Sequence, residues 1–167
     1  TPCSEGTVQP EASQSECARC EAGKYQGGTG QTACFNCTAS NYCPPGASAA
    51  LPCPSGRFQN ATLTTLNLSM TSELDCVVCP AGHFCSTGAE AATPCSPGTV
   101  QPSSGQGSCI ECVAGKYQHG SSETACFDCT ASNYCPLGAS AELPCPSGRY
   151  SGAEGLWQDV QCTACPE

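Results

Sequence analysis

Six pairs of cysteines in this chain are separated by two residues, a spacing found in zinc sites, in redox-active thiol pairs and where one disulfide-bonded repeat meets the next. A zinc site combines two such pairs about 12–20 residues apart, and a redox pair requires a βαβ setting that this sequence does not predict. A regular phrase after every second cysteine, the glycosylation motifs and the scarcity of basic residues favour disulfides. The pairs are Cys17/Cys20, Cys34/Cys37, Cys76/Cys79, Cys109/Cys112, Cys126/Cys129 and Cys162/Cys165.

The composition supports the same interpretation. The chain has 19 cysteines in 167 residues, above the roughly 8–10% that is typical of disulfide scaffolds. Disulfides on this scale persist in oxidising compartments, so we expect an extracellular, secreted or cell-surface protein. With five Lys and Arg and a net charge of −9, the chain has no basic patch for nucleic acid. No apolar stretch approaches the roughly 18 residues of a membrane helix. The residues that follow Thr1 have neither the charged nor the apolar region of a signal peptide, so we expect any signal peptide to be missing from this piece.

The sequence is nearly two copies of one unit. Residues 38–58 and 130–150 differ only at Pro45/Leu137, Ala50/Glu142 and Phe58/Tyr150. The same offset relates TPCSEGTVQP, which starts at Thr1, to TPCSPGTVQP, which starts at Thr93. We therefore predict a first copy over residues 1–92 and a second, truncated copy over residues 93–167.

A shorter repeat lies inside each copy. Its phrase is Cys, two residues, Gly or Ser, one residue, and then an aromatic residue or Val, as in CEAGKY. Glycine allows the positive φ of a tight turn, and the aromatic residue begins a short strand whose ring can cover a disulfide. The fold class is therefore small, disulfide-rich and mostly irregular, with short two-stranded β-hairpins stacked into an elongated tandem-repeat rod and no helices of note. The opening cysteines are Cys3, Cys20, Cys37, Cys53 and Cys79 in the first copy, and Cys95, Cys112, Cys129, Cys145 and Cys165 in the second.

Joining each opening cysteine to the next cysteine uses every cysteine except Cys165, which would open a further, truncated subunit. Where only five residues separate two cysteines, a crossed pattern to the neighbouring subunit is an alternative. The predicted pairs are Cys3–Cys17, Cys20–Cys34, Cys37–Cys43, Cys53–Cys76, Cys79–Cys85, Cys95–Cys109, Cys112–Cys126, Cys129–Cys135 and Cys145–Cys162.

The segment from Cys79 to Gln118, CPAGHFCSTGAEAATPCSPGTVQPSSGQGSCIECVAGKYQ, resembles the ephrin-receptor-like cysteine-rich repeat. This repeat is related to EGF-like and tumour-necrosis-factor-receptor modules and is found in algal and protist surface proteins. The resemblance covers essentially the whole chain. It implies an extracellular, elongated, disulfide-laddered rod, and it brings no catalytic residues. The acidic cluster of calcium-binding EGF modules is missing from the sequence.

Three Asn-X-Ser/Thr motifs predict N-glycosylation, which needs an exposed acceptor. Asn60 and Asn67 lie in the long loop between Cys53 and Cys76, and Asn36, between two cysteines, is the least favoured acceptor. His83 and His119 occupy non-equivalent positions without an evident acidic or nucleophilic partner, so no catalytic site, metal or cofactor is predicted.

The leading functional hypothesis is a structural segment of an extracellular repeat glycoprotein that forms a stalk or a mastigoneme- or fibril-like surface filament. Its partners would be neighbouring repeats or other copies of itself, because near-identical copies present equivalent surfaces. The alternative hypothesis is the ectodomain of a receptor that binds a protein ligand.

Overall fold

The computed structural model describes residues 2–11, 15–66 and 68–166, and the chain divides into two compact units. Unit 1 contains Thr1–Val78 and Cys85–Ala91, and unit 2 contains Cys79–Phe84 and Ala92–Glu167. The sequence copies 1–92 and 93–167 are defined by similarity alone, and that they are domains stays a prediction. We name each hairpin after its opening cysteine.

The described residues of unit 1 form four two-stranded antiparallel sheets, in which each strand has two residues. In the Cys20 hairpin, for example, Lys24 lies opposite Asn36 and Tyr25 lies opposite Phe35. The hairpins are β1 (Thr7–Val8) with β2 (Ala18–Arg19), β3 (Lys24–Tyr25) with β4 (Phe35–Asn36), β5 (Asn41–Tyr42) with β6 (Leu51–Pro52), and β7 (Arg57–Phe58) with β8 (Val77–Val78).

Unit 2 repeats this pattern with five hairpins. The hairpins are β9 (His83–Phe84) with β10 (Thr93–Pro94), β11 (Thr99–Val100) with β12 (Ile110–Glu111), β13 (Lys116–Tyr117) with β14 (Phe127–Asp128), β15 (Asn133–Tyr134) with β16 (Leu143–Pro144), and β17 (Arg149–Tyr150) with β18 (Thr163–Ala164). The predicted fold class of disulfide-rich, two-stranded hairpins in a repeated pattern is confirmed.

The repeated phrase forms the turn that starts each hairpin. In the Cys20 hairpin, the Lys24 amide donates to the Glu21 carbonyl at 3.1 Å, and Gly23 between them has φ +82°. This is the β-turn geometry that requires a positive φ at its third residue. The variant phrase CTASNY forms the same turn with serine, because Ser40 and Ser132 have φ values of +61° and +63°. The predicted role of the fourth phrase residue is therefore confirmed.

Backbone hydrogen bonds join successive hairpins within each unit. In unit 2 the Gly115 amide donates to the Cys135 carbonyl at 2.8 Å, and the Gly115 carbonyl accepts from the Cys129 amide at 2.9 Å. The Gly138 amide also donates to the Cys112 carbonyl at 2.8 Å. Corresponding bonds connect Gly23 with Cys37 and Cys43 in unit 1. Because these contacts are made by the backbone, the same interface recurs with little dependence on side chains.

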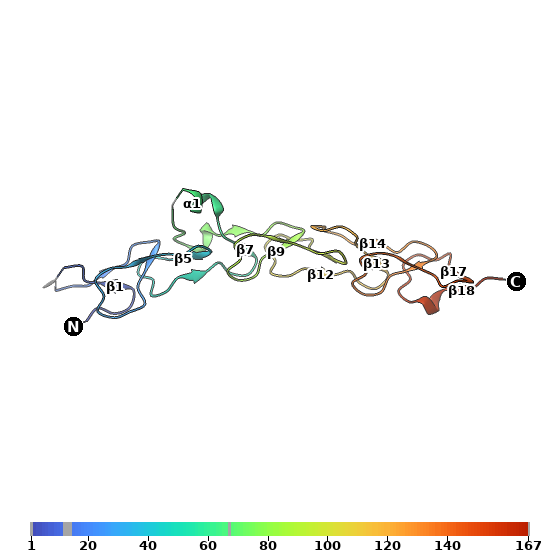
Figure 1. Ribbon diagram of the computed structural model, residues 1–167, viewed down its shortest axis with the longest axis horizontal. Helices are drawn as coiled ribbons and strands as arrows, with labels where there is room; N and C mark the ends of the chain where they lie inside the picture. Colours follow the sequence, from blue (N-terminus) through green and yellow to red (C-terminus); the bar gives the residue numbers. More distant parts are fainter. Residues whose placement is uncertain (1, 12–14, 67, 167) are drawn as a thin grey trace. The chain divides into compact units, whose positions relative to one another are not determined.

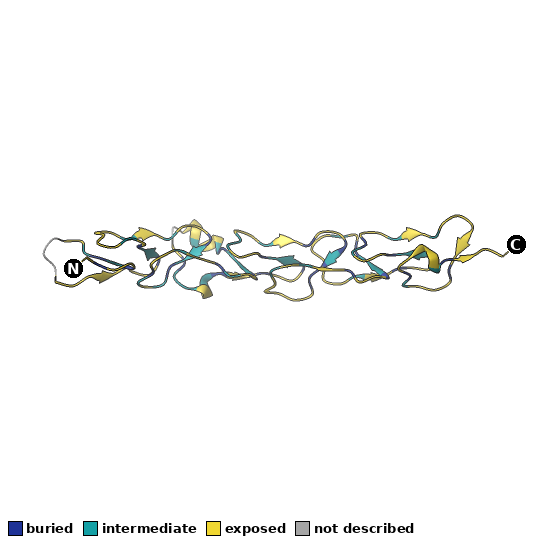
Figure 2. Ribbon diagram, turned by 90° about the horizontal axis from the view of Figure 1, so that it is seen from below, coloured by how far each residue is buried: buried dark blue, intermediate teal, exposed yellow. Residues whose placement is uncertain are grey.

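The buried interior consists mainly of disulfides, as expected for a chain with few large apolar residues. In two hairpins the tyrosine ring packs against a disulfide of the next hairpin: Tyr42 packs against Cys53 and Cys76, and Tyr117 packs against Cys129 and Cys135. Figure 2 shows the exposed second strands in yellow, whereas the first strands are mostly half-buried. One face of each hairpin thus packs on its neighbours and the other meets solvent.

In the part of the chain that the structure describes, helix is restricted to short segments of three to five residues. The five-residue helix α1 (Ala61–Thr65) lies beside the strands of unit 1 in Figure 1, within the long loop between Cys53 and Cys76. Two 3₁₀ helices, η1 (Glu73–Asp75) and η2 (Asp159–Gln161), precede Cys76 and Cys162. The sequence showed no helical period, because α1 is too short to display one. No helix in the described ranges has the length and apolar character needed to cross a membrane.

Candidate functional site

The paired cysteines form disulfides in the structure. Within a Cys-X-X-Cys pair, the first cysteine closes one hairpin and the second opens the next: Cys17 bonds to Cys3, and Cys20 bonds to Cys34. The Cα–Cα distances of 5.7–5.9 Å are usual for disulfides. Each sulfur atom is therefore bonded to the sulfur of a cysteine in the same hairpin. This arrangement differs from a zinc site, in which the cysteines bind the metal as thiolates.

Eight of the predicted pairs are present, including the short Cys37–Cys43 and Cys129–Cys135 bridges for which a crossed pattern was the alternative. Cys79 and Cys85 are also disulfide-bonded, and their pairing with each other stays a prediction. Cys165 is a free and exposed cysteine. The other observed pairs are Cys3–Cys17, Cys20–Cys34, Cys53–Cys76, Cys95–Cys109, Cys112–Cys126 and Cys145–Cys162.

The glycosylation motifs lie in different surroundings from those expected. Asn60 is half-buried and caps α1, with its side-chain oxygen accepting from the Leu63 amide at 3.4 Å. Asn36 is exposed on β4, so the expectation that it is the less accessible of the two is wrong for the folded chain. Asn67 lies outside the described residues. Glycan occupancy at all three positions stays a prediction.

The two histidines make surface contacts. The His119 ring stacks on Phe127 with 5.9 Å between ring centroids, and Tyr117 lies 6.2 Å from His119. The Nδ1 atom of His83 lies 3.2 Å from the Ala81 carbonyl, and its Nε2 atom lies 3.5 Å from the Ser122 hydroxyl. Both histidines therefore contribute to the packing of exposed loops in unit 2.

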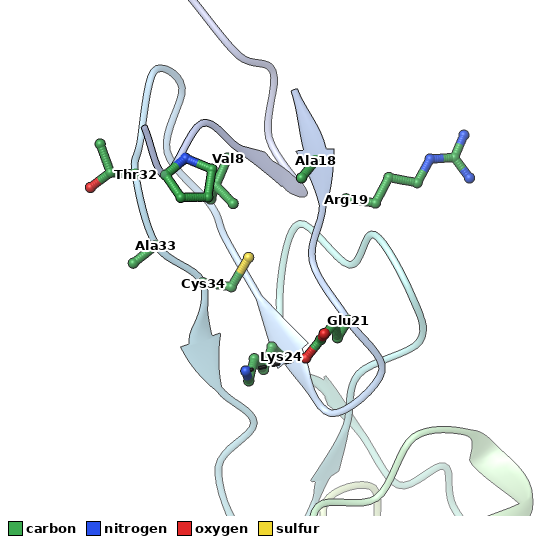
Figure 3. Close-up of a pocket in the computed structure, with 9 residues that line it drawn as sticks. Val8, Ala18, Arg19, Glu21, Lys24, Thr32, Ala33 and Cys34 are labelled. Atoms are coloured by element: carbon green, nitrogen blue, oxygen red, sulfur yellow. Dashed lines mark hydrogen bonds and ion pairs between the residues drawn. The ribbon is translucent and has the colours of Figure 1, made fainter. Parts of the chain in front are cut away.

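Figure 3 shows a hollow of about 330 Å³ at the first two hairpins of unit 1. Lys24 and Glu21 form an ion pair of 3.4 Å at its rim, with side chains that are 43% and 82% exposed. Arg19 points away from Lys24 in this view, so the two cations do not converge on one point. Cys34 in its lining is bonded to Cys20. The hollow is a solvated surface depression with mixed charge.

Buried glutamines are the functional residues that sequence reasoning missed. In the Cys112 hairpin, Gln118 is 1% exposed. Its Nε2 atom donates to the Ala125 carbonyl at 2.7 Å, and its Oε1 atom accepts from the Gly120 amide at 2.9 Å. Gln26 and Gln101 make the equivalent bonds in their hairpins. These side chains hold the loop closed just before the second cysteine of each hairpin.

The signal for these glutamines was present in the repeated phrase. The residue six positions after the opening cysteine is glutamine where the disulfide spans 14 residues, as at Cys20 and Cys112. At Cys37 and Cys129 the same position is the cysteine that closes the short disulfide, Cys43 or Cys135. A cysteine in a disulfide and a glutamine with a hydrogen-bonded side-chain amide thus occupy the same position in different repeats.

The comparisons with family models and with curated proteins gave no match for this chain. The features that recur through both units are the disulfides, the glutamines and the backbone contacts between hairpins. The interface between successive hairpins is therefore the candidate functional surface.

Proposed function

We propose that this chain is a structural segment of an extracellular, disulfide-rich repeat glycoprotein, acting as a stalk or as part of a surface filament. The observation that carries the proposal is the recurring backbone interface, in which the phrase residue at Gly23 or Gly115 bonds to the following hairpin. Such an interface allows hairpins to be added in series, as in other repeat proteins. Its role is mechanical and non-catalytic.

The disulfides support an oxidising location. The bonded cysteines make up half of the buried side chains, and reduction would remove the links that order a chain with so few other core residues. Disulfides of this number are characteristic of secreted and cell-surface proteins. We therefore infer that the segment lies outside the cell, and we expect Asn60 and Asn67 to carry glycans there.

Small-angle scattering tests the structural role. A single compact domain of this length has a radius of gyration of about 15 Å, whereas serial stacking of hairpins predicts a clearly larger value. Full reduction should bring exchange of the Gly23 and Gly115 amides to the rate of an unfolded chain. A monomer with the radius of a compact domain would contradict the stalk or filament.

A receptor ectodomain is the second candidate, favoured by apolar side chains on the outer strands. Phe35, Ile110 and Phe127 are 59%, 55% and 51% exposed. Exposed aromatic residues are frequent anchors of protein interfaces. The domains of the full-length protein discriminate the two candidates. A membrane helix followed by a signalling domain would favour the receptor, and further copies of the repeat would favour the filament.

A further inference from the structure

The single methionine of the chain, Met70, lies in the interior of unit 1. Its side chain is 5% exposed and packs against the Cys53–Cys76 disulfide. Tyr42 of the preceding hairpin and Leu63 of α1 pack against the same cluster. The thioether of Met70 is therefore part of the apolar contact that joins the long loop to its neighbours.

The backbone around Met70 connects the long loop to the two hairpins before it. The Met70 carbonyl accepts from the Cys43 amide at 3.1 Å, and Met70 forms an isolated β-bridge with Tyr42. Ser69 covers the phrase glycine two hairpins earlier, because a Cβ atom added to Gly23 would lie 2.8 Å from the Ser69 Cβ. The Met70 side chain holds this backbone in place, since it keeps the segment packed on the disulfide.

Unit 2 makes the same contact with leucine. Leu156 occupies the position of Met70, is 7% exposed and forms an isolated β-bridge with Tyr134. Its carbonyl accepts from the Cys135 amide at 2.8 Å. A hydrocarbon side chain is therefore sufficient for the packing. The sulfur atom of Met70 adds a chemical property that leucine lacks, because peroxides oxidise a thioether to a sulfoxide.

A hollow beside Met70 gives small solutes access to this cluster. Its volume of about 190 Å³ is several times the roughly 30 Å³ that one molecule occupies in liquid water, and it is open to solvent. Hydrogen peroxide is only slightly larger than water, so it fits next to Met70. The hollow is lined by two residues of the Cys37 hairpin and four of the long loop, Cys37, Ala39, Thr64, Leu68, Ser69 and Met70.

We propose that Met70 is an oxidation site, at which hydrogen peroxide forms methionine sulfoxide and releases the long loop from the Cys37 hairpin. The thioether sulfur donates a lone pair to one peroxide oxygen, so that a sulfur–oxygen bond forms and the oxygen–oxygen bond breaks. The displaced hydroxide takes the proton from the transferred oxygen and leaves as water. Sulfur is thereby oxidised by two electrons, and the peroxide is reduced.

The product explains the release. A sulfoxide is polar, and burying a polar group against the Cys53–Cys76 disulfide and the Tyr42 ring without a hydrogen-bond partner is unfavourable. The segment of Met70 therefore moves out of the cluster, and the Cys43 amide loses its acceptor. This modification goes beyond the stalk or filament and does not depend on it.

Peroxide treatment of the folded chain with Cys165→Ser tests the proposal, because that substitution removes the free thiol. We expect peptide mapping to find the sulfoxide at Met70 with the disulfides intact. Amide hydrogen exchange followed by NMR should then be roughly tenfold or more faster at Cys43. The Cys135 amide of the same molecule should keep its rate, because its acceptor is the Leu156 carbonyl.

Met70→Leu is the matched control, since leucine makes this contact in unit 2. In that variant the Cys43 amide should exchange as in the untreated parent chain, both before and after peroxide. Met70→Gln places a polar amide in the cluster and should speed Cys43 exchange without peroxide. The proposal is overturned if Met70 stays unmodified under conditions that fully oxidise a free methionine peptide. Sulfoxide formation with unchanged exchange at Cys43 would overturn it equally.

Discussion

The Gln118 side chain donates a 2.7 Å hydrogen bond to the carbonyl of Ala125, the residue directly before Cys126. Cys126 is bonded to Cys112, which opens the same hairpin. The buried amide and the disulfide therefore restrain one loop from two sides. The disulfide reduces the conformational entropy of the unfolded chain. The glutamine side chain forms hydrogen bonds with backbone groups that the loop would otherwise bury without partners.

Replacing Gln118 by alanine should destabilise the Cys112 hairpin by about 1–3 kcal/mol, since it leaves the Ala125 carbonyl and the Gly120 amide without their partner. Denaturant unfolding with intact disulfides measures the loss, and faster exchange of the Gly120 amide localises it. Gln106→Ala is the control, because that exposed side chain donates only a 3.3 Å bond to Ser104. Equal effects of the two substitutions would refute a specific role for Gln118.

Ser122→Gly should stabilise unit 2 by about 0.5–1 kcal/mol, because Ser122 has φ +64° and the left-handed conformation is strained for a residue with a Cβ atom. The corresponding residue of the first copy is Gly30, with φ +66°. Ser132→Gly is the comparison, since it also loses the 3.1 Å bond from the Ser132 hydroxyl to the Ser151 carbonyl. In thermal unfolding, the Ser122→Gly variant should have a higher unfolding temperature than the Ser132→Gly variant.

Acid should weaken the hydrogen bonds that the Asp75 carboxylate accepts at the end of the long loop between Cys53 and Cys76. Hydrogen bonds from the Thr71 backbone, and then from Ser72, lower the pKa of Asp75 below its ordinary value of 3.8, although partial burial opposes them. Because the pKa of Asp75 is lower in the folded chain than in the unfolded chain, the stability that its hydrogen bonds contribute is present above pH 3.8. It is lost as the pH falls through the pKa that Asp75 has in the folded chain. Proton exchange of the Thr71 and Ser72 amides, followed by NMR, should therefore quicken in that range.

The second unit provides the control for acid loosening. Gln161 occupies the position of Asp75, and its Oε1 atom accepts from the Trp157 and Gln158 amides at 2.9 and 3.0 Å. These amides should keep their protection in acid, and Asp75→Asn should remove the pH dependence in unit 1. Identical acid profiles for the two loops would show that Asp75 does not cause the change.

Asn60 should carry a glycan without losing its helix cap. The sugar attaches to the side-chain nitrogen, whereas the cap uses the side-chain oxygen that accepts from Leu63. Glycopeptide mapping should find Asn60 and Asn67 occupied and Asn36 less so, because Asn36, although exposed, lies between the bonded cysteines Cys34 and Cys37. Thr62→Ala removes the motif but keeps the cap, so it should abolish the Asn60 glycan with little change in unfolding temperature. Occupancy at Asn36 alone would reverse the ranking.

Alkylation of the native chain should label Cys165 and leave the eighteen bonded cysteines unmodified. Peptide mapping without reduction should also recover a Cys79–Cys85 bridge, the predicted pair for those two bonded cysteines. A second labelled cysteine, or a peptide that crosslinks Cys79 to a different hairpin, would show that the predicted pairing is wrong at this point.

The sequence predicted the disulfide framework because the repeated phrase fixes which cysteine opens each hairpin. It also predicted the turn at Gly23 and its equivalents, since few residues other than glycine adopt a positive φ at low cost. The same reasoning extended to Ser40 and Ser132, which share the position in the phrase and adopt the same turn. Local patterns were sufficient wherever one residue type has one dominant physical role.

The burial of Gln118, the cap formed by Asn60 and the exposure of Asn36 were decided by tertiary structure. Glutamine is usually exposed, so its sequence position alone does not indicate that it replaces a cysteine inside a hairpin. Its burial is favourable only because the folded loop directs the Ala125 carbonyl and the Gly120 amide toward it. Contacts of this kind join residues whose proximity exists only after the chain has folded. The repeated phrase marks the position of the glutamine, but it does not show which backbone groups the side chain binds.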